Sequence, residues 1–204
     1  RAEKCYAQKL QRFSSAKSQR KSSWHTSGTT IITGGVGNLG LKTALWLADK
    51  GVEKIALSSS VIDNPNLITQ IGNQVGTQSV IVVLDVKKKI FGGYEVFTHN
   101  GKKATGIDPF KFIKNAQKLG AGEIVINSID RDGKGNGYDI ELINKVTGNV
   151  NIPVIACGGV GDWEDFADAF EQTSADAVAA ANIFHYRDQS VFLAKKFLYD
   201  FKFN

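Results

Sequence analysis

The chain has 204 residues, of which 42% are hydrophobic and 22% charged, and it carries a formal net charge of +5. This length is enough for one domain with a single core, and no apolar run is long enough to span a membrane. The only cysteines, Cys5 and Cys157, are too few for a disulfide framework and favour a reducing cytoplasm. Methionine is absent, even at the first position, so we expect a fragment of a longer protein.

The positive charge is concentrated at the amino end. Residues 1–27 contain seven basic side chains and one acidic residue, Glu3, which gives this segment +6 and leaves −1 for the remainder. A basic nucleic-acid-binding patch on the folded part is therefore not indicated. The segment is also rich in serine and lacks an apolar period, so we expect a disordered lead-in over 1–27.

From residue 28 onward, short β-branched runs alternate with amphipathic segments. The predicted strands cover residues 30–33, 54–57, 80–84, 123–126, 154–156 and 177–181. Asn64-Pro65, Asp108-Pro109, Asp139 and Asp162 are placed to begin helices, and residues 190–201 predict a last helix. Gly92-Gly93 and Asn100-Gly101 predict an inserted hairpin after the third strand. Six consecutive βα units predict a parallel α/β fold of the barrel type.

Polar residues follow several of these strands directly. The apolar run at 124–126 continues into Asn127, Ser128, Asp130, Arg131 and Asp132, followed by three glycines. A strand that opens into carboxylates, a guanidinium and bare backbone amides predicts a ligand-binding loop. Parallel strands deliver such groups to one edge of the sheet.

A diglycine motif occurs twice. Gly34-Gly35-Val36-Gly37 recurs as Gly158-Gly159-Val160-Gly161, and Ser58 and Asn182 are separated by the same 124 positions. Backbone amides without side chains can approach phosphate oxygens closely, so the pair predicts two phosphate sites. The alternative for either motif alone is a tight strand–helix turn.

Residues 51–204 resemble the cyclase subunits of imidazole glycerol phosphate synthase. The resemblance rests on GVEKIALSSSVIDNPNLI, VIVVLDVKK, YEVFTHNGKKATG, GAGEIVINSIDRDGKGNGYD, IPVIACGGVG and DAVAAANIFHYRD, in this order. It implies a TIM (βα)-barrel of which six of eight units are present, without strands one and two. It also implies a lyase of histidine biosynthesis that closes an imidazole ring on a bisphosphorylated ribulosyl substrate, using ammonia from a glutaminase subunit and no cofactor. The C-terminal AANIFHYRDQSVFLAKKFL is most similar to paralogues that modify surface sugars with acetamidino groups.

The resemblance also implies roles for individual residues. Asp85 matches a catalytic general acid or base, with pairing to Lys87 as the structural alternative. One phosphate site would comprise Asp132, Gly133, Gly158, Gly159, Ala181 and Asn182. A second phosphate site would comprise Gly35, Ser58 and Ser59, and the mouth would be lined by Asn127 and Ser128. An ammonia gate at the opposite end of the barrel would comprise Lys54 and Glu123, which otherwise read as solvated charges. Cys157 is predicted to be a small packing residue.

The front of the chain resembles a different family. GTTIITGGVGNLGLKTALWLADKG, residues 28–51, is similar to the start of a polyketide-synthase ketoreductase, in which such a fingerprint binds NADPH. We therefore expect residues 28–204 to form a partial barrel with a join near 50–57, as in a chimera. NADPH is implied only under the reductase interpretation. A further alternative is a non-catalytic remnant or recombined scaffold that binds phosphates without turnover and could complete its open sheet as a homodimer.

Overall fold

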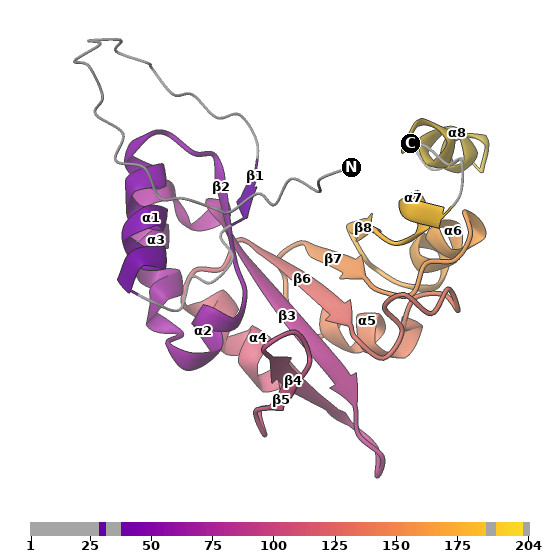
Figure 1. Ribbon diagram of the computed structural model, residues 1–204, viewed down its shortest axis with the longest axis horizontal. Coiled ribbons are helices and arrows are strands. Elements are labelled where there is room, and N and C mark those ends of the chain that lie inside the picture. Colours follow the sequence, from indigo (N-terminus) through magenta and orange to yellow (C-terminus); the bar gives the residue numbers. More distant parts are fainter. Residues whose placement is uncertain (1–28, 32–37, 187–190, 202–204) are drawn as a thin grey trace, which may run out of the picture.

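The computed structural model describes residues 29–31, 38–186 and 191–201 (Figure 1). The predicted lead-in over 1–27, the whole first diglycine motif at 34–37 and with it the candidate phosphate residue Gly35 lie outside the described residues. Predictions for these positions stay predictions.

The six predicted strands form one parallel sheet in chain order (Figure 1). They are β1 (Thr29–Ile31), β2 (Lys54–Leu57), β3 (Val80–Lys88), β6 (Glu123–Ser128), β7 (Val154–Cys157) and β8 (Ala177–Ala179). Sequence-ordered parallel strands joined by helices are the arrangement of a TIM barrel, and the prediction of a partial barrel is confirmed. Within the described part of the chain, β1 and β8 do not pair with each other, so the sheet is open there.

The insertion after the third strand is the predicted antiparallel hairpin. It comprises β4 (Tyr94–Thr98) and β5 (Lys103–Ala104), and β4 pairs with the far end of β3. This pairing carries β3 on to Lys88, four residues beyond its predicted end. The turn glycines Gly92 and Gly93 have φ values of 91° and 80°, which a residue with a side chain rarely adopts.

Helices cover the outer face of the curved sheet (Figure 1). They are α1 (Asn38–Asp49), α2 (Ser59–Asp63), α3 (Asn66–Val75), α4 (Pro109–Lys118), α5 (Ile140–Thr147), α6 (Glu164–Gln172), α7 (Ile183–Tyr186) and α8 (Val191–Asp200), with a short 3-10 turn, η1 (Thr77–Ser79), before β3. Asp108 accepts hydrogen bonds from the amides of Phe110 and Lys111, and Asp139 accepts one from Leu142, as the sequence predicts. The cap predicted for α6 differs in part: Asp162 accepts from the amide of Trp163, the residue before the helix, and Asp165 in the first turn accepts from the amides of residues 161 and 162.

The two faces of the sheet are buried to different degrees. Side chains alternate between the faces along each strand. Those under the helices are almost completely buried; Val82, Leu84, Ile124, Ile126, Val154 and Ala156 are all between 0% and 1% exposed. Their neighbours on the inner face are only half-buried, among them Val83, Val125 and Ile155. The core therefore lies between the sheet and the helices, and the inside of the open barrel remains accessible.

Candidate functional site

The candidate catalytic residue lies in a row of aligned residues at the carboxyl ends of the strands. Asp85 of β3 is the register partner of Asn127 of β6, which is the partner of Cys157 of β7, which in turn aligns with Ala179 of β8. Because register partners in a parallel sheet face the same side, all four side chains project to the half-buried inner face. The register thus brings together Asp85 and Asn127, two predicted site residues that are 42 positions apart.

Asp85 is held by its neighbour in this row. The side-chain amide of Asn127 donates a hydrogen bond from Nδ2 to Oδ1 of Asp85 over 2.9 Å. The structural alternative for Asp85, pairing with Lys87, is not what the fold adopts, since the Lys87 ammonium lies 3.7 Å from the carboxylate of Asp130. Asp85 is therefore a half-buried carboxylate with one fixed oxygen, in a position suited to proton transfer.

The other two polar residues predicted around this row have different placements. Ser128 follows Asn127 directly, so its side chain lies on the opposite face of β6, where the residue is only 4% exposed. It does not line the mouth with Asn127. Burial raises the pKa of the Cys157 thiol, and the nearby charges of Asp132 and Asp85 raise it further. Cys157 is half-buried in the aligned row, and its packing role stays a prediction.

The loop after β6 is joined to the loop after β7 by backbone contacts. The amide of Gly137 donates to the carbonyl of Gly159 over 3.0 Å, and the Arg131 guanidinium donates to the carbonyls of Asn136 and Gly137. A Cβ atom at Gly159 would lie 2.1 Å from the Gly137 carbonyl oxygen. Gly158 and Gly159 are buried, so the second diglycine motif is required for packing between loops, a reason that the sequence does not reveal.

Two of the predicted phosphate residues meet at a small cavity beside these loops. The cavity has a volume of about 140 Å³ and is lined by Gly133, Lys134, Gly135, Val160, Gly161, Asn182 and Ile183. Gly133 and Asn182 are thus brought together, whereas Asp132, Gly158, Gly159 and Ala181 are not among its lining residues. Sequence reasoning missed Lys134, whose exposed ammonium is the one cationic side chain in the described lining. The signal in the sequence that could have identified Lys134 is its position between Gly133 and Gly135 in the predicted ligand-binding loop.

The second predicted phosphate site is described only in part. Ser58 precedes the short helix α2 and Ser59 begins it, and both residues are half-buried at the carboxyl end of β2. Ser58 makes no side-chain capping hydrogen bond to the helix. Both hydroxyls are therefore placed at the same end of the sheet as Asp85.

Lys54 and Glu123 form an ion pair at the opposite end of the sheet. They begin β2 and β6, which are separated by β3, and the Lys54 ammonium donates directly to a carboxylate oxygen of Glu123. Their side chains are 42% and 17% exposed. The alternative that both are independently solvated charges is wrong, because the register of three strands places them in contact on the inner face.

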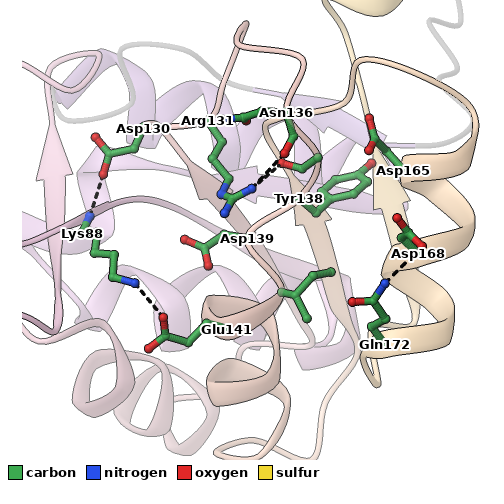
Figure 2. A pocket seen from close by; sticks show the side chains of 12 residues that line it. Lys88, Asp130, Arg131, Asn136, Tyr138, Asp139, Glu141, Asp165, Asp168 and Gln172 are labelled. Carbon is green, nitrogen blue, oxygen red and sulfur yellow. Dashed lines mark hydrogen bonds and ion pairs between the residues drawn. The ribbon is translucent and has the colours of Figure 1, made fainter.

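Figure 2 shows a larger cavity, and none of its described lining residues is a predicted site residue. Its volume is about 380 Å³, and its wall includes Lys88, Arg131, Tyr138, Asp165 and Asp168. Among the described residues, no group of His, Cys, Asp and Glu is arranged to hold a metal ion. No helix in the described ranges is long and apolar enough to cross a membrane.

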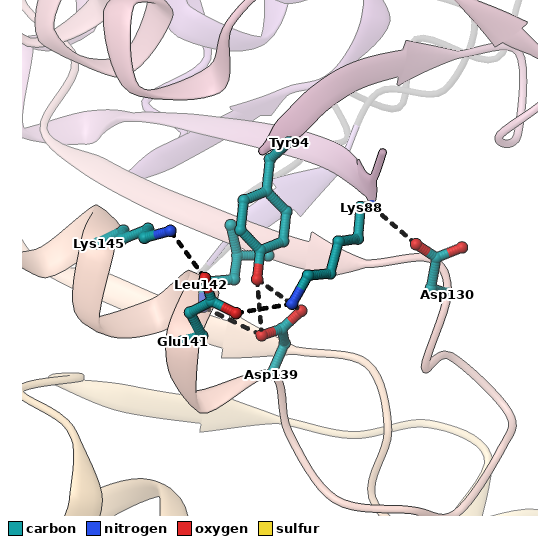
Figure 3. A network of polar contacts seen from close by, with 7 residues as sticks. All are labelled: Lys88, Tyr94, Asp130, Asp139, Glu141, Leu142 and Lys145. Carbon is teal, nitrogen blue, oxygen red and sulfur yellow. Dashed lines mark hydrogen bonds and ion pairs between the residues drawn. The ribbon is translucent and has the colours of Figure 1, made fainter. Parts of the chain in front are cut away.

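A polar network beside this cavity fastens the inserted hairpin to α5 (Figure 3). The Tyr94 hydroxyl donates to Asp139, which is only 8% exposed, and the ammonium groups of Lys88 and Lys145 both contact Glu141. Burial and the charge of Asp139 raise the pKa of Tyr94 well above its ordinary value. The hydroxyl therefore remains a donor, and the network has a structural role.

Several known proteins are similar in sequence to this chain. The family model described as "Histidine biosynthesis protein" matches residues 15–190. The chain is 43% identical over 150 residues to the imidazole glycerol phosphate synthase subunit HisF of Alkaliphilus metalliredigens, which covers 74% of this chain and 60% of the relative. It is 42% identical over 167 residues to the subunit of the same name from Dehalococcoides mccartyi, and 43% identical over 170 residues to that of Pyrobaculum aerophilum. Each of these two matches covers 82% of this chain and 65% of the relative, so the chain spans about three fifths of its relatives' length.

Proposed function

The chain belongs to the histidine biosynthesis protein family, and from this premise we propose that it performs cyclase-type lyase chemistry. In the proposed reaction, ammonia closes an imidazole ring on a ribulosyl substrate that carries two phosphates. The observation that carries this proposal is the position of Asp85, a half-buried carboxylate at a strand end on the inner face. Active sites of TIM barrels lie at this end, and a carboxylate there can donate or accept protons.

A substitution of Asp85 tests this role. Asp85→Asn keeps the size and shape of the side chain but removes its ability to accept a proton. Because general acid–base assistance is worth about 10²–10⁴-fold, turnover should fall by that factor. The measurement is a steady-state assay with the ribulosyl bisphosphate and ammonium salts, with Asp63→Asn at an exposed helix end as the matched control. Unchanged turnover in Asp85→Asn removes Asp85 from the mechanism.

We expect the turnover of these 204 residues to be weak. The resemblance implies two carboxylates acting from opposite sides of the barrel mouth, and Asp85 is the one carboxylate in the aligned row of described residues. Asp132 and Asp130, both in the loop after β6, are the nearest candidates for the second group. A rate comparable to that of an intact cyclase, lost in Asp132→Asn, would establish that Asp132 serves as the second group.

One substrate phosphate is proposed to bind at the 140 Å³ cavity. The exposed backbone of Gly133 and the amide of Asn182 offer hydrogen-bond donors, and the Lys134 ammonium adds a positive charge. Addition of a phosphorylated ligand should shift the NMR amide signals of residues 133 and 182, and Asn182→Leu should weaken the shift. If no amide signal in this loop moves, the phosphate proposal is wrong.

A glutaminase partner is proposed at the amino ends of the strands. The Lys54–Glu123 ion pair supports this, because paired charges on the inner face can form a gate through which ammonia passes. Lys54→Met should lower glutamine-supported turnover, with the glutaminase added, more than ammonium-supported turnover. Equal effects on both would contradict a gate.

The similarity of the C-terminal stretch favours a second candidate, a paralogue that modifies surface sugars with acetamidino groups. Turnover of an acetamidino-sugar precursor, and not of the ribulosyl bisphosphate, would select it. Phosphate binding without turnover of either substrate would select the recombined-scaffold alternative. The proposed chemistry needs no cofactor and takes place in the cytoplasm, and NADPH binding is expected only under the reductase interpretation.

A further inference from the structure

The contact between Asn127 and Asp85 is built into the sheet. The two residues are register partners on neighbouring parallel strands, and their side chains share the inner face. The Nδ2–Oδ1 distance of 2.9 Å is that of a well-formed hydrogen bond, and the strand backbones on both sides fix the two Cα atoms. The contact is thus held by the sheet and not by a loop.

This contact leaves the other end of the Asn127 amide without a hydrogen-bond partner among the described residues. Its carbonyl oxygen, Oδ1, is buried and has no hydrogen-bond donor among the described residues, and it is the one such side-chain atom there. Turning the amide over would bring this oxygen against the carboxylate of Asp85, which places two acceptors in contact. The orientation of the amide is therefore set by Asp85, and its own carbonyl is left unsatisfied.

Gly158 completes the arrangement. A Cβ atom at this position would lie 2.7 Å from Oδ1 of Asn127, so the space that the amide occupies exists because residue 158 has no side chain. A buried polar atom without a partner is rare in proteins and marks a place where another requirement prevails. Here the requirement is a donor directed at Asp85.

The two oxygens of Asp85 consequently differ. Oδ1 accepts from Asn127, whereas Oδ2 has no donor among the described residues. Asp85 is only half-buried, on the inner face of the open barrel, which leaves Oδ2 for contact with a substrate. We infer that Asn127 is a positioning residue that holds Oδ1 and thereby presents Oδ2 as the oxygen that exchanges protons with the substrate. In each turnover Oδ2 takes one proton from the substrate and returns it in a later step, so the carboxylate is regenerated.

This inference rests on the proposed function, and it gives a specific role to Asn127, which the resemblance places only at the mouth. Misplacement of a reacting group by about 1 Å can cost on the order of 100-fold in rate. Asn127→Leu keeps the branched shape of the side chain and removes the donor, so kcat should fall by roughly 10–100-fold with KM within about twofold of wild type. A residue that binds substrate in both ground and transition states would instead raise KM.

A double-mutant cycle tests whether Asn127 acts through Asp85. Turnover is compared for wild type, Asn127→Leu, Asp85→Asn and the double variant, with Asn144→Leu as a control for loss of an exposed, hydrogen-bonded asparagine. If Asn127 acts through Asp85, the double variant is no slower than Asp85→Asn alone. If instead the rate losses of the two single variants multiply in the double variant, the inference is wrong. Asn127→Ser, which is too short to reach Asp85, repeats the test should the leucine variant fail to fold.

A second measurement does not depend on activity. The side-chain amide of Asn127 is followed by ¹H–¹⁵N NMR in wild type and in Asp85→Ala. Loss of a carboxylate acceptor should move the donated amide proton upfield, whereas an unchanged signal overturns the inference. If wild type itself has no turnover with any substrate, the proposed function fails, and the amide signal still decides whether Asn127 holds Asp85.

Discussion

The packing between the loops after β6 and β7 gives the sharpest prediction for stability. Gly159 has a φ of 117°, and a Cβ atom there would lie 2.1 Å from the carbonyl oxygen of Gly137. Since non-bonded atoms prefer separations of about 3.5 Å, Gly159→Ala must push the loops apart by roughly 1 Å. That movement breaks the 3.0 Å hydrogen bond from the Gly137 amide to the Gly159 carbonyl and strains the contact of Arg131 with the Gly137 carbonyl.

The loss of stability in Gly159→Ala can be separated into two parts with a matched control. Gly93 also has a positive φ, 80°, but a Cβ atom there would meet nothing within 4 Å. Gly93→Ala should therefore lose only the backbone cost of the left-handed conformation, about 1–2 kcal/mol. Gly159→Ala adds the lost hydrogen bonds and the displaced packing, for a total of about 3–5 kcal/mol.

The assay is urea unfolding followed by circular dichroism, with both variants compared to wild type. An excess loss of about 2–3 kcal/mol in Gly159→Ala over Gly93→Ala is the expected result. Equal losses would refute the reasoning, because the positive φ would then account for the whole effect. The same variant should also weaken phosphate binding at the 140 Å³ cavity, since Gly135 and Gly161 line it on the two joined loops.

Three further predictions follow from the network at α5 and from the open sheet. Tyr94→Phe should cost about 1–3 kcal/mol in urea unfolding, because it removes the donor to the buried Asp139. Because the pKa of Tyr94 is raised above its ordinary value, its hydrogen bond stabilises the fold fully below pH 10, and this stabilisation is lost as the pH rises further. Tyr94→Phe should therefore flatten the fall in stability at alkaline pH. Hydrogen bonds from Lys145 and Lys88 lower the pKa of Glu141 to about 2. The stabilisation of the fold by ionised Glu141 is therefore present above pH 4.5, the ordinary pKa of the group, and is lost as the pH falls towards 2. The free energy of unfolding of Glu141→Gln should thus be lower than that of wild type at neutral pH in low salt. The difference should vanish at about 1 M salt, where charges are screened within about 3 Å. Finally, the half-buried apolar inner face should cause concentration-dependent self-association, as in the predicted homodimer, and sedimentation that shows a monomer at all concentrations would contradict this.

The sequence alone determined the elements and their order. The β-branched runs at 80–84, 123–126 and 154–156 all lie in strands of the parallel sheet. The Asp108-Pro109 pair begins a helix as predicted, because a carboxylate cap and a residue with a fixed φ act within a few residues of each other. Signals of this kind are local, so they can be interpreted without knowledge of the tertiary structure.

The tertiary structure decided which groups meet. Asn127 reaches Asp85 across 42 positions, and Lys54 reaches Glu123 across 69, because the register of neighbouring strands aligns them. The hydrophobic pattern of a strand decides which face each residue takes, but which residue lies opposite depends on both strands of a pair together. Alternation along β6 turns Ser128 away from the mouth, and the path of the two following loops packs Gly159 on Gly137. Residue types at strand ends therefore predicted a site, while only the alignment of the strands decided which atoms it contains.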